Sequence, residues 1–176
     1  EIIYQQRAKV LDGEDLHENI LKMIRELIQA TVDKYLLDDD SKEDWNLTGL
    51  KEYFLGWITL ETDFVDHTEE ALEKIDKKDV VQTLTDRAIE NYNAKEAEYG
   101  KEIIRELERV ILLKVVDAKW TAHIDDMDEL KKGIVLRAYG QKNPVVEYRY
   151  EGFEMFDAMI ESIREDTVRL LMTVRI

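Results

Sequence analysis

The densest group of side chains that could hold a metal ion or move a proton surrounds His123. Asp125, Asp126 and Asp128 follow it closely, and Asp126 would share a helix surface with His123 at a spacing of three residues. Imidazole and carboxylate groups in this arrangement can bind a divalent cation or act as an acid–base pair. The pattern is also typical of an exposed or hydrogen-bonded histidine on a solvated helix, and we favour that interpretation.

Two other acidic stretches could bind metal ions. Glu14 and His17 form a Glu-x-x-His pair, but a di-iron bundle needs two such pairs and two further carboxylates. We therefore interpret the pair as the first turn of a helix. The run Asp38–Asp40 lacks the central glycine and the closing glutamate of an EF-hand calcium loop, so a solvated linker is the better explanation.

Several catalytic motifs are absent from the sequence. It contains no Gly-x-x-x-x-Gly-Lys-Ser/Thr phosphate loop, no Gly-x-Ser-x-Gly elbow and no His-Glu-x-x-His motif. It also contains no cysteine, which excludes thiol nucleophiles and thiolate zinc sites and fits a reducing compartment. We expect no catalytic or metal-binding residue in this chain, and no ATP hydrolysis by the chain alone.

Composition and charge indicate a helical protein that does not act mainly on nucleic acid. With 37% charged residues, one proline and seven glycines among 176 residues, long solvated helices are favoured. A formal net charge of −15 opposes binding to phosphates. No apolar run is long enough to cross a bilayer, so we expect a soluble, cytoplasmic protein. Because the chain begins at Glu1 and not at a methionine, we expect it to be part of a longer protein.

One stretch departs from the acidic average. Residues 130–146 contain no acidic side chain, and the basic residues among them are Lys131, Lys132, Arg137 and Lys142. Tyr139 lies between small residues there, away from any apolar stripe. Two interpretations stay open: a tyrosine folded back on the end of a hairpin, or an exposed aromatic that contacts a partner chain.

Two long helices must position this basic stretch. The first is predicted to begin with Asp79 as its N-cap and to run through Gly100, its weak point, to about Gly133. Residues 101–132 would then span about 50 Å. Its apolar stripe is Leu113, Val116, Trp120, Ile124, Met127, Leu130 and Ile134, so we expect Trp120 to lie in the core.

The second helix returns after a turn at Gln141–Pro144. It is predicted to begin between Glu147 and Glu151 and to end near Val174. Its heptad-like stripe is Phe153, Phe156, Ile160, Ile163, Thr167, Leu170 and Val174. Two long helices joined by a short turn pack antiparallel, which predicts a long helical hairpin.

The residues before the hairpin predict a further helix and a small helical lobe. Steps of three and four from Leu16 predict a helix to about Leu37. From there to about Gly100, we expect short helices over 47–56 and after the N-cap Thr68, with an extended piece over 58–60. The predicted fold class is all-α, with no sheet.

A string of residues in the hairpin carries a resemblance. It comprises Trp120, His123, Met127-Asp128, Leu130, Gly133-Ile134, Leu136-Arg137, Tyr139, Gln141, Pro144, Glu147-Tyr148 and Phe153. This string resembles the C-terminal scaffold of the SecA family of bacterial preprotein translocase ATPases. The resemblance covers nearly the whole chain and is weakest from Asp38 to Lys78. Gly140 stands where alanine is common in that family.

The resemblance implies a division into three parts. Residues 1–37 would be the first part of a helical scaffold, 38–100 a helical wing and 101–176 a two-helix finger. In the SecA family these parts follow motor domains, absent from this sequence, that bind ATP and magnesium and whose ATPase the scaffold restrains. No cofactor is therefore expected in this chain.

The resemblance also implies partners. The finger would reach into the mouth of the SecY channel at the cytoplasmic face of the bacterial cell membrane, as a peripheral contact, and its loop would touch the unfolded preprotein. The residues expected to make these contacts are Leu136, Arg137, Ala138, Tyr139, Gly140, Gln141 and Lys142. Its own motor domains would be a further partner, and nucleic acid would not. The alternative is a stand-alone helical interaction module, such as an adaptor or a chaperone.

Overall fold

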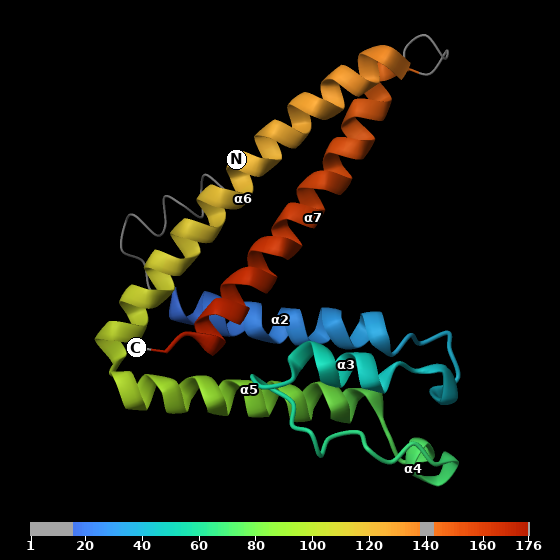
Figure 1. Cartoon of the computed structure of the whole chain (residues 1–176), viewed down its shortest axis with the longest axis vertical. Coiled ribbons are helices and arrows are strands. Elements are labelled where there is room, and N and C mark those ends of the chain that lie inside the picture. The colour runs from blue at the N-terminus through green and yellow to red at the C-terminus, as the bar shows by residue number, and fades with distance from the viewer. Residues whose placement is uncertain (1–15, 138–142, 176) are drawn as a thin grey trace. The chain divides into compact units, whose positions relative to one another are not determined.

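The computed structural model describes residues 16–137 and 143–175. Its elements are α2 (His17–Tyr35), η1 (Lys42–Asp44), α3 (Leu47–Phe54), α4 (Glu69–Glu73), α5 (Lys77–Tyr99), α6 (Lys101–Arg137) and α7 (Pro144–Thr173) (Figure 1). Within these residues there is no strand, only an isolated bridge between Leu55 and Thr59. The all-α prediction is confirmed. No helix in the described part has the length and hydropathy that a membrane span requires.

The described residues form two compact units. We call residues 16–108 and 168–175 the platform, and residues 109–137 and 143–167 the hairpin. The helices α6 and α7 each contribute to both units. This division does not test the predicted boundaries after residues 37 and 100, and the scaffold, wing and finger assignments stay predictions.

The platform core lies between α2 and α5, which pack along one another. The buried residues of α2 are Ile20, Leu21, Ile24, Leu27, Ile28, Thr31 and Val32, and they include steps of three and four like those that predicted this helix. The buried residues of α5 are Val80, Leu84, Ala88 and Tyr92. The end of α7 also contacts the platform, because the guanidinium of Arg169 lies over the rings of Tyr53 in α3 at 5.2 Å and of Trp57 just after it at 5.5 Å.

The ends of the platform helices follow their capping side chains. Thr68 caps α4 as predicted, and its hydroxyl accepts a 3.2 Å hydrogen bond from the Ala71 amide. The predicted N-cap Asp79 is wrong, since Asp76 accepts from the Lys78 amide at 3.1 Å and α5 begins three residues earlier. The continuous helix predicted through Gly100 is also wrong. That glycine has a φ of +95°, a conformation that L side chains rarely adopt, and it separates α5 from α6.

In the hairpin, α6 and α7 pack antiparallel, as predicted (Figure 1). Lys119 Nζ lies 2.9 Å from Asp166 Oδ2, and the rings of His123 and Phe156 lie 5.9 Å apart. Farther along α6, the Met127 side chain lies against Gly152. Residues later in α6 therefore pair with residues earlier in α7, as in an antiparallel helix pair.

Both helices extend closer to the turn than predicted. The first helix passes Gly133 and ends at Arg137. The second begins at Pro144, and Asn143 Oδ1 accepts a 3.1 Å hydrogen bond from the Val145 amide. Proline suits the first turn because the missing N–H has no helical partner there. The predicted end at Gly133 and start after Glu147 are therefore wrong.

The seam between the helices differs in part from the predicted stripes. Its buried residues include Leu112, Val115, Val116, Leu130 and Ile134 of α6, and Gly152, Met159, Ile163 and Thr167 of α7. Trp120, Ile124 and Phe153 are 36%, 46% and 70% exposed, so the assignments of these three residues to the buried stripes are wrong. A seven-residue repeat drifts by about 20° per heptad on a straight helix, which turns Phe153, at the end of the α7 stripe, away from the seam. Trp120 and Ile124 lie within the α6 stripe, and this drift does not explain their exposure.

Candidate functional site

The end of the hairpin carries the predicted contact residues. Leu136, in the last turn of α6, is 71% exposed, and Arg137 is the last residue of that helix. Ala138, Tyr139, Gly140, Gln141 and Lys142 lie outside the described residues. The contact role of the set stays a prediction, and the structure shows only that the Leu136 side chain is accessible.

Further exposed apolar side chains lie on either side of the turn. They are Val135 on α6 and Val145, Val146, Tyr150 and Phe153 on α7. Lys131 and Lys132, one turn back on α6, are also exposed. A local concentration of exposed apolar groups is typical of a surface that contacts another molecule. The sequence did not predict that α7 adds residues to this exposed surface. The second helix was expected to begin only near Glu147 to Glu151, and Phe153 was assigned to the seam.

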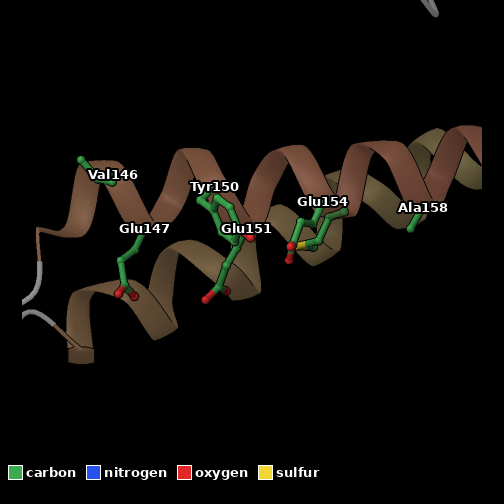
Figure 2. A pocket seen from close by; sticks show the side chains of 7 residues that line it. Val146, Glu147, Tyr150, Glu151, Glu154 and Ala158 are labelled. Atoms are coloured by element: carbon green, nitrogen blue, oxygen red, sulfur yellow. The ribbon is translucent and has the colours of Figure 1, made fainter. Parts of the chain in front are cut away.

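A shallow groove follows the beginning of α7. It is lined by Val146, Glu147, Tyr150, Glu151, Glu154, Met155 and Ala158. Figure 2 shows the carboxylates of Glu147, Glu151 and Glu154 pointing to the same side of the helix. The groove therefore combines apolar surface with negative charge, while the adjacent end of α6 carries exposed lysines. This arrangement suits contact with a polypeptide and offers no arrangement of nucleophile and base.

His123 lies in the seam of the hairpin. Its ring packs edge-on against Phe156, with an angle of 72° between the planes, and lies 5.6 Å from the ring of Trp120. Across residues 16–137 and 143–175, no three histidine, aspartate or glutamate side chains are placed to hold a metal ion. The structure therefore gives His123 a packing role between two aromatic rings.

The Asp38–Asp40 stretch is exposed and lies between α2 and η1. The Lys77 ammonium lies 2.8 Å from Asp33 Oδ1 and 2.9 Å from Asp38 Oδ1. These hydrogen bonds, the one with Asp33 foremost, raise the pKa of Lys77 above its ordinary value. Asp38 thus takes part in an ion pair that joins the stretch to the first turn of α5.

The platform contains a buried polar cluster that sequence analysis missed. Glu108 is fully buried. Its Oε2 accepts a hydrogen bond of 2.9 Å from the Tyr92 hydroxyl and lies 2.9 Å from His17 Nδ1. Arg105 Nη1 lies 3.2 Å from Glu108 Oε1 and 2.9 Å from Glu96 Oε2. We call these five residues the Glu108 cluster.

A sequence signal for this cluster exists. Glu108 lies four residues after Ile104 and four before Leu112, both buried, so a carboxylate occupies the apolar face of the helix. A buried carboxylate needs hydrogen-bond donors. Its position predicts that donors gather around it, although the sequence does not identify them. His17 lies in the first turn of α2, while Glu14, the other member of the predicted first-turn pair, lies outside the described residues; the contact of His17 with Glu108 was not foreseen.

Comparison with known proteins identifies the family. Residues 1–175 match the family described as the SecA wing and scaffold domain. This chain belongs to that family. It is 49% identical over 174 residues to the protein translocase subunit SecA of Finegoldia magna, covering 99% of this chain and 19% of that relative. It is 43% identical over 176 residues to the SecA of Acetivibrio thermocellus, covering 100% of this chain and 19% of that relative.

The SecA resemblance drawn from the hairpin residues is confirmed. The chain spans about a fifth of the length of the curated SecA relatives that it matches. It corresponds to the wing and scaffold part of SecA-type translocase subunits, and protein transport is the process to which such subunits belong. The platform and the hairpin are the two compact units into which the described residues of this wing and scaffold part fold.

Proposed function

We propose that this chain supplies the scaffold, wing and two-helix finger of an ATP-driven preprotein translocase. In the whole protein, the end of the hairpin contacts the unfolded polypeptide at the cytoplasmic mouth of the SecY channel. The scaffold helices restrain the ATPase of the motor domains, which bind ATP and magnesium. The observation that carries the proposal is an antiparallel hairpin, in a SecA-family chain, whose end exposes apolar side chains such as Leu136.

The hairpin has the mechanical properties that this role needs. Each helix satisfies its own backbone hydrogen bonds, and the side chains of the seam interlock. The ion pair of Lys119 with Asp166 joins the two helices at the end of the hairpin distant from the turn. A displacement of one helix along its axis is therefore transmitted to the other, and from there to the turn.

The chemistry of the hairpin end suits an unfolded partner. A translocating chain presents changing side chains, so a useful contact must rely on apolar surface and on backbone groups. The exposed apolar residues beside the turn offer such surface, and Tyr139 would add a ring with a polar end. Lys131 and Lys132 suit acidic channel loops or anionic lipid head groups at the membrane face.

A photo-crosslinking experiment on the whole translocase tests this proposal. A photoreactive phenylalanine analogue replaces Leu136, and a preprotein is stalled part-way through membrane vesicles that contain the channel. The matched control carries the same analogue at Val65 of the platform, which is 67% exposed, against 71% for Leu136. We expect ATP-dependent crosslinks to the preprotein from position 136 alone. Equal crosslinking from both positions, or none from position 136, would reject the contact.

The upstream gene sequence separates this proposal from a stand-alone interaction module. A translocase requires a phosphate-binding loop several hundred residues before Glu1, because this chain has none. An adaptor or chaperone requires a start codon close to Glu1. Sequencing the gene decides between the two without any assay of transport.

A further inference from the structure

The Glu108 cluster spans the break between α5 and α6. Tyr92 and Glu96 lie in the last two turns of α5, whereas Arg105 and Glu108 lie in the first two turns of α6. The hydrogen bonds of Tyr92 with Glu108 and of Glu96 with Arg105 therefore cross Gly100. His17, at the start of α2, contacts the same buried carboxylate from a third helix.

The two hydrogen bonds that cross Gly100 exist only while the helix is broken. In one continuous helix, Tyr92 and Glu108 would be 16 residues apart and separated by about 24 Å along the axis. Glu96 and Arg105, nine residues apart, would lie about 13 Å apart on nearly opposite faces. The cluster and the break at Gly100 thus require one another.

The backbone on either side of the break is helical up to the glycine itself. The Gly100 amide donates to the Glu96 carbonyl at 2.8 Å, and the Gly100 carbonyl accepts from the Ile104 amide at 3.1 Å. The torsions at Gly100, with φ +95° and ψ 146°, separate the two helices. Rotation at this residue to helical torsions would restore a continuous ladder of hydrogen bonds.

The buried carboxylate stabilises the broken form. Glu108 has no access to water, so it depends on donors from other residues to offset the loss of hydration. Tyr92 supplies a hydrogen bond that a continuous helix would place out of reach, whereas the Arg105 contact lies within α6 at a spacing of three residues and would persist. Charges of both signs meet here, with Glu96 and Glu108 facing Arg105 and the ring of His17.

We propose that Gly100 is a two-state switch in which the Glu108 cluster holds α5 and α6 apart, and release of the cluster lets them join into one helix. In the bent state α5 and α6 are apart and the buried hydrogen bonds of the cluster form. In the straight state the two helices are joined, and Gly100 adopts helical torsions. The free-energy difference between them depends on both terms. The switch does not depend on what the hairpin end contacts, so it stands apart from the proposed function.

Distance measurements on the 176-residue chain test the switch. Because the sequence has no cysteine, two introduced cysteines can be spin-labelled without background. We choose Gln82 on α5 and Glu106 on α6, which are both exposed. Their Cα atoms would be about 36 Å apart in a straight helix and closer together in the bent form. Pulsed electron paramagnetic resonance reports both populations at once.

Gly100→Ala is the decisive variant. An added Cβ meets no atom within 4 Å, so the substitution introduces no clash and acts only on the backbone torsions. Alanine disfavours a φ of +95°, so we expect the population near 36 Å to rise by about tenfold or more. Adding Tyr92→Phe removes one donor to Glu108, and we expect the same population to rise further.

Gly56→Ala is the matched control. Gly56 also has a positive φ, +90°, with no atom within 4 Å of an added Cβ, but it lies outside the cluster. It should leave the distance distribution unchanged. A distribution equally unchanged in the Gly100 and Tyr92 variants overturns the proposal. So does a loss of helical circular dichroism in these variants without a population near 36 Å, because the cluster would then only stabilise the fold.

Discussion

The hydroxyl of Tyr92 donates a 2.9 Å hydrogen bond to Oε2 of Glu108, a carboxylate with no exposed surface. Burial raises the pKa of Tyr92 above its ordinary value, and the adjacent charge of Glu108 raises it further. The phenol is therefore held in its neutral, donating form in the folded chain. This one contact connects the stability of the platform to the protonation of a tyrosine.

Tyr92→Phe should lower the free energy of unfolding by about 1–2 kcal/mol, because the buried carboxylate loses a donor while the ring keeps its packing. Urea denaturation followed by circular dichroism measures the loss. Tyr99→Phe, at the partly exposed end of the same helix, is the control and should stay within about 0.5 kcal/mol of the parent. Equal losses in the two variants would show that the hydrogen bond contributes nothing.

The same tyrosine predicts a pH dependence of stability. An unfolded tyrosine loses its proton near pH 10, whereas the raised pKa keeps Tyr92 protonated in the folded chain. Above about pH 10 the folded state then binds more protons than the unfolded state, so stability falls as the pH rises. We expect the parent to lose stability more steeply there than Tyr92→Phe. Parallel curves for the two chains would contradict this assignment.

Local patterns predicted much of the fold because they report local physics. The apolar steps of α2 and the Thr68 cap depend on neighbours within one or two turns, and both were correct. Asp76 and Asp79 both suit an N-cap, and the sequence alone gives no reason to prefer the earlier one. Phe153, at the end of the predicted α7 stripe, is exposed because a strict heptad drifts around a straight helix, whereas the exposure of Trp120 and Ile124 within the α6 stripe has no such explanation.

Long-range contacts explain what sequence analysis missed. The cluster brings His17 next to Glu108 across 91 residues, a pairing that no local spacing encodes. A glycine at position 100 predicts only a small loss of helix stability, and the buried cluster makes it a complete break. At the hairpin end, the charge pattern and the family resemblance predicted the contact residues. Among them, the structure describes the side chain of Leu136.

Two glycines of the hairpin should respond in opposite directions to substitution. A Cβ at Gly152 would lie 3.1 Å from the methyl carbon of Met127, so Gly152→Leu should separate the helices and cost about 1–3 kcal/mol. Gly133 lies inside α6 with no atom within 4 Å, so Gly133→Leu should stabilise the chain by about 0.5–1 kcal/mol. Thermal unfolding compares the two, and a Gly152→Leu variant as stable as the parent would contradict the close contact of Gly152 with Met127.

The purified chain should not hydrolyse ATP. Its sequence has no phosphate-binding loop to hold the nucleotide, and the proposed role leaves ATP and magnesium to the motor domains. A coupled phosphate-release assay with increasing ATP should give no saturable turnover, with the whole translocase as the positive control. Turnover that saturates with ATP and survives further purification would overturn this expectation.

Tyr139→Ala in the whole translocase should weaken preprotein transport much more than it weakens folding. The residue follows Arg137, the last residue of α6, by two positions in the sequence, in the stretch without acidic side chains, and alanine removes both the ring and its hydroxyl. Transport into membrane vesicles and thermal unfolding are measured on the same preparation. Ile124→Ala serves as the control, since it removes an apolar side chain that is 46% exposed on α6 of the same unit, outside the surface beside the turn. If transport and stability fall together for Tyr139→Ala, the ring packs back on the hairpin and has no contact role.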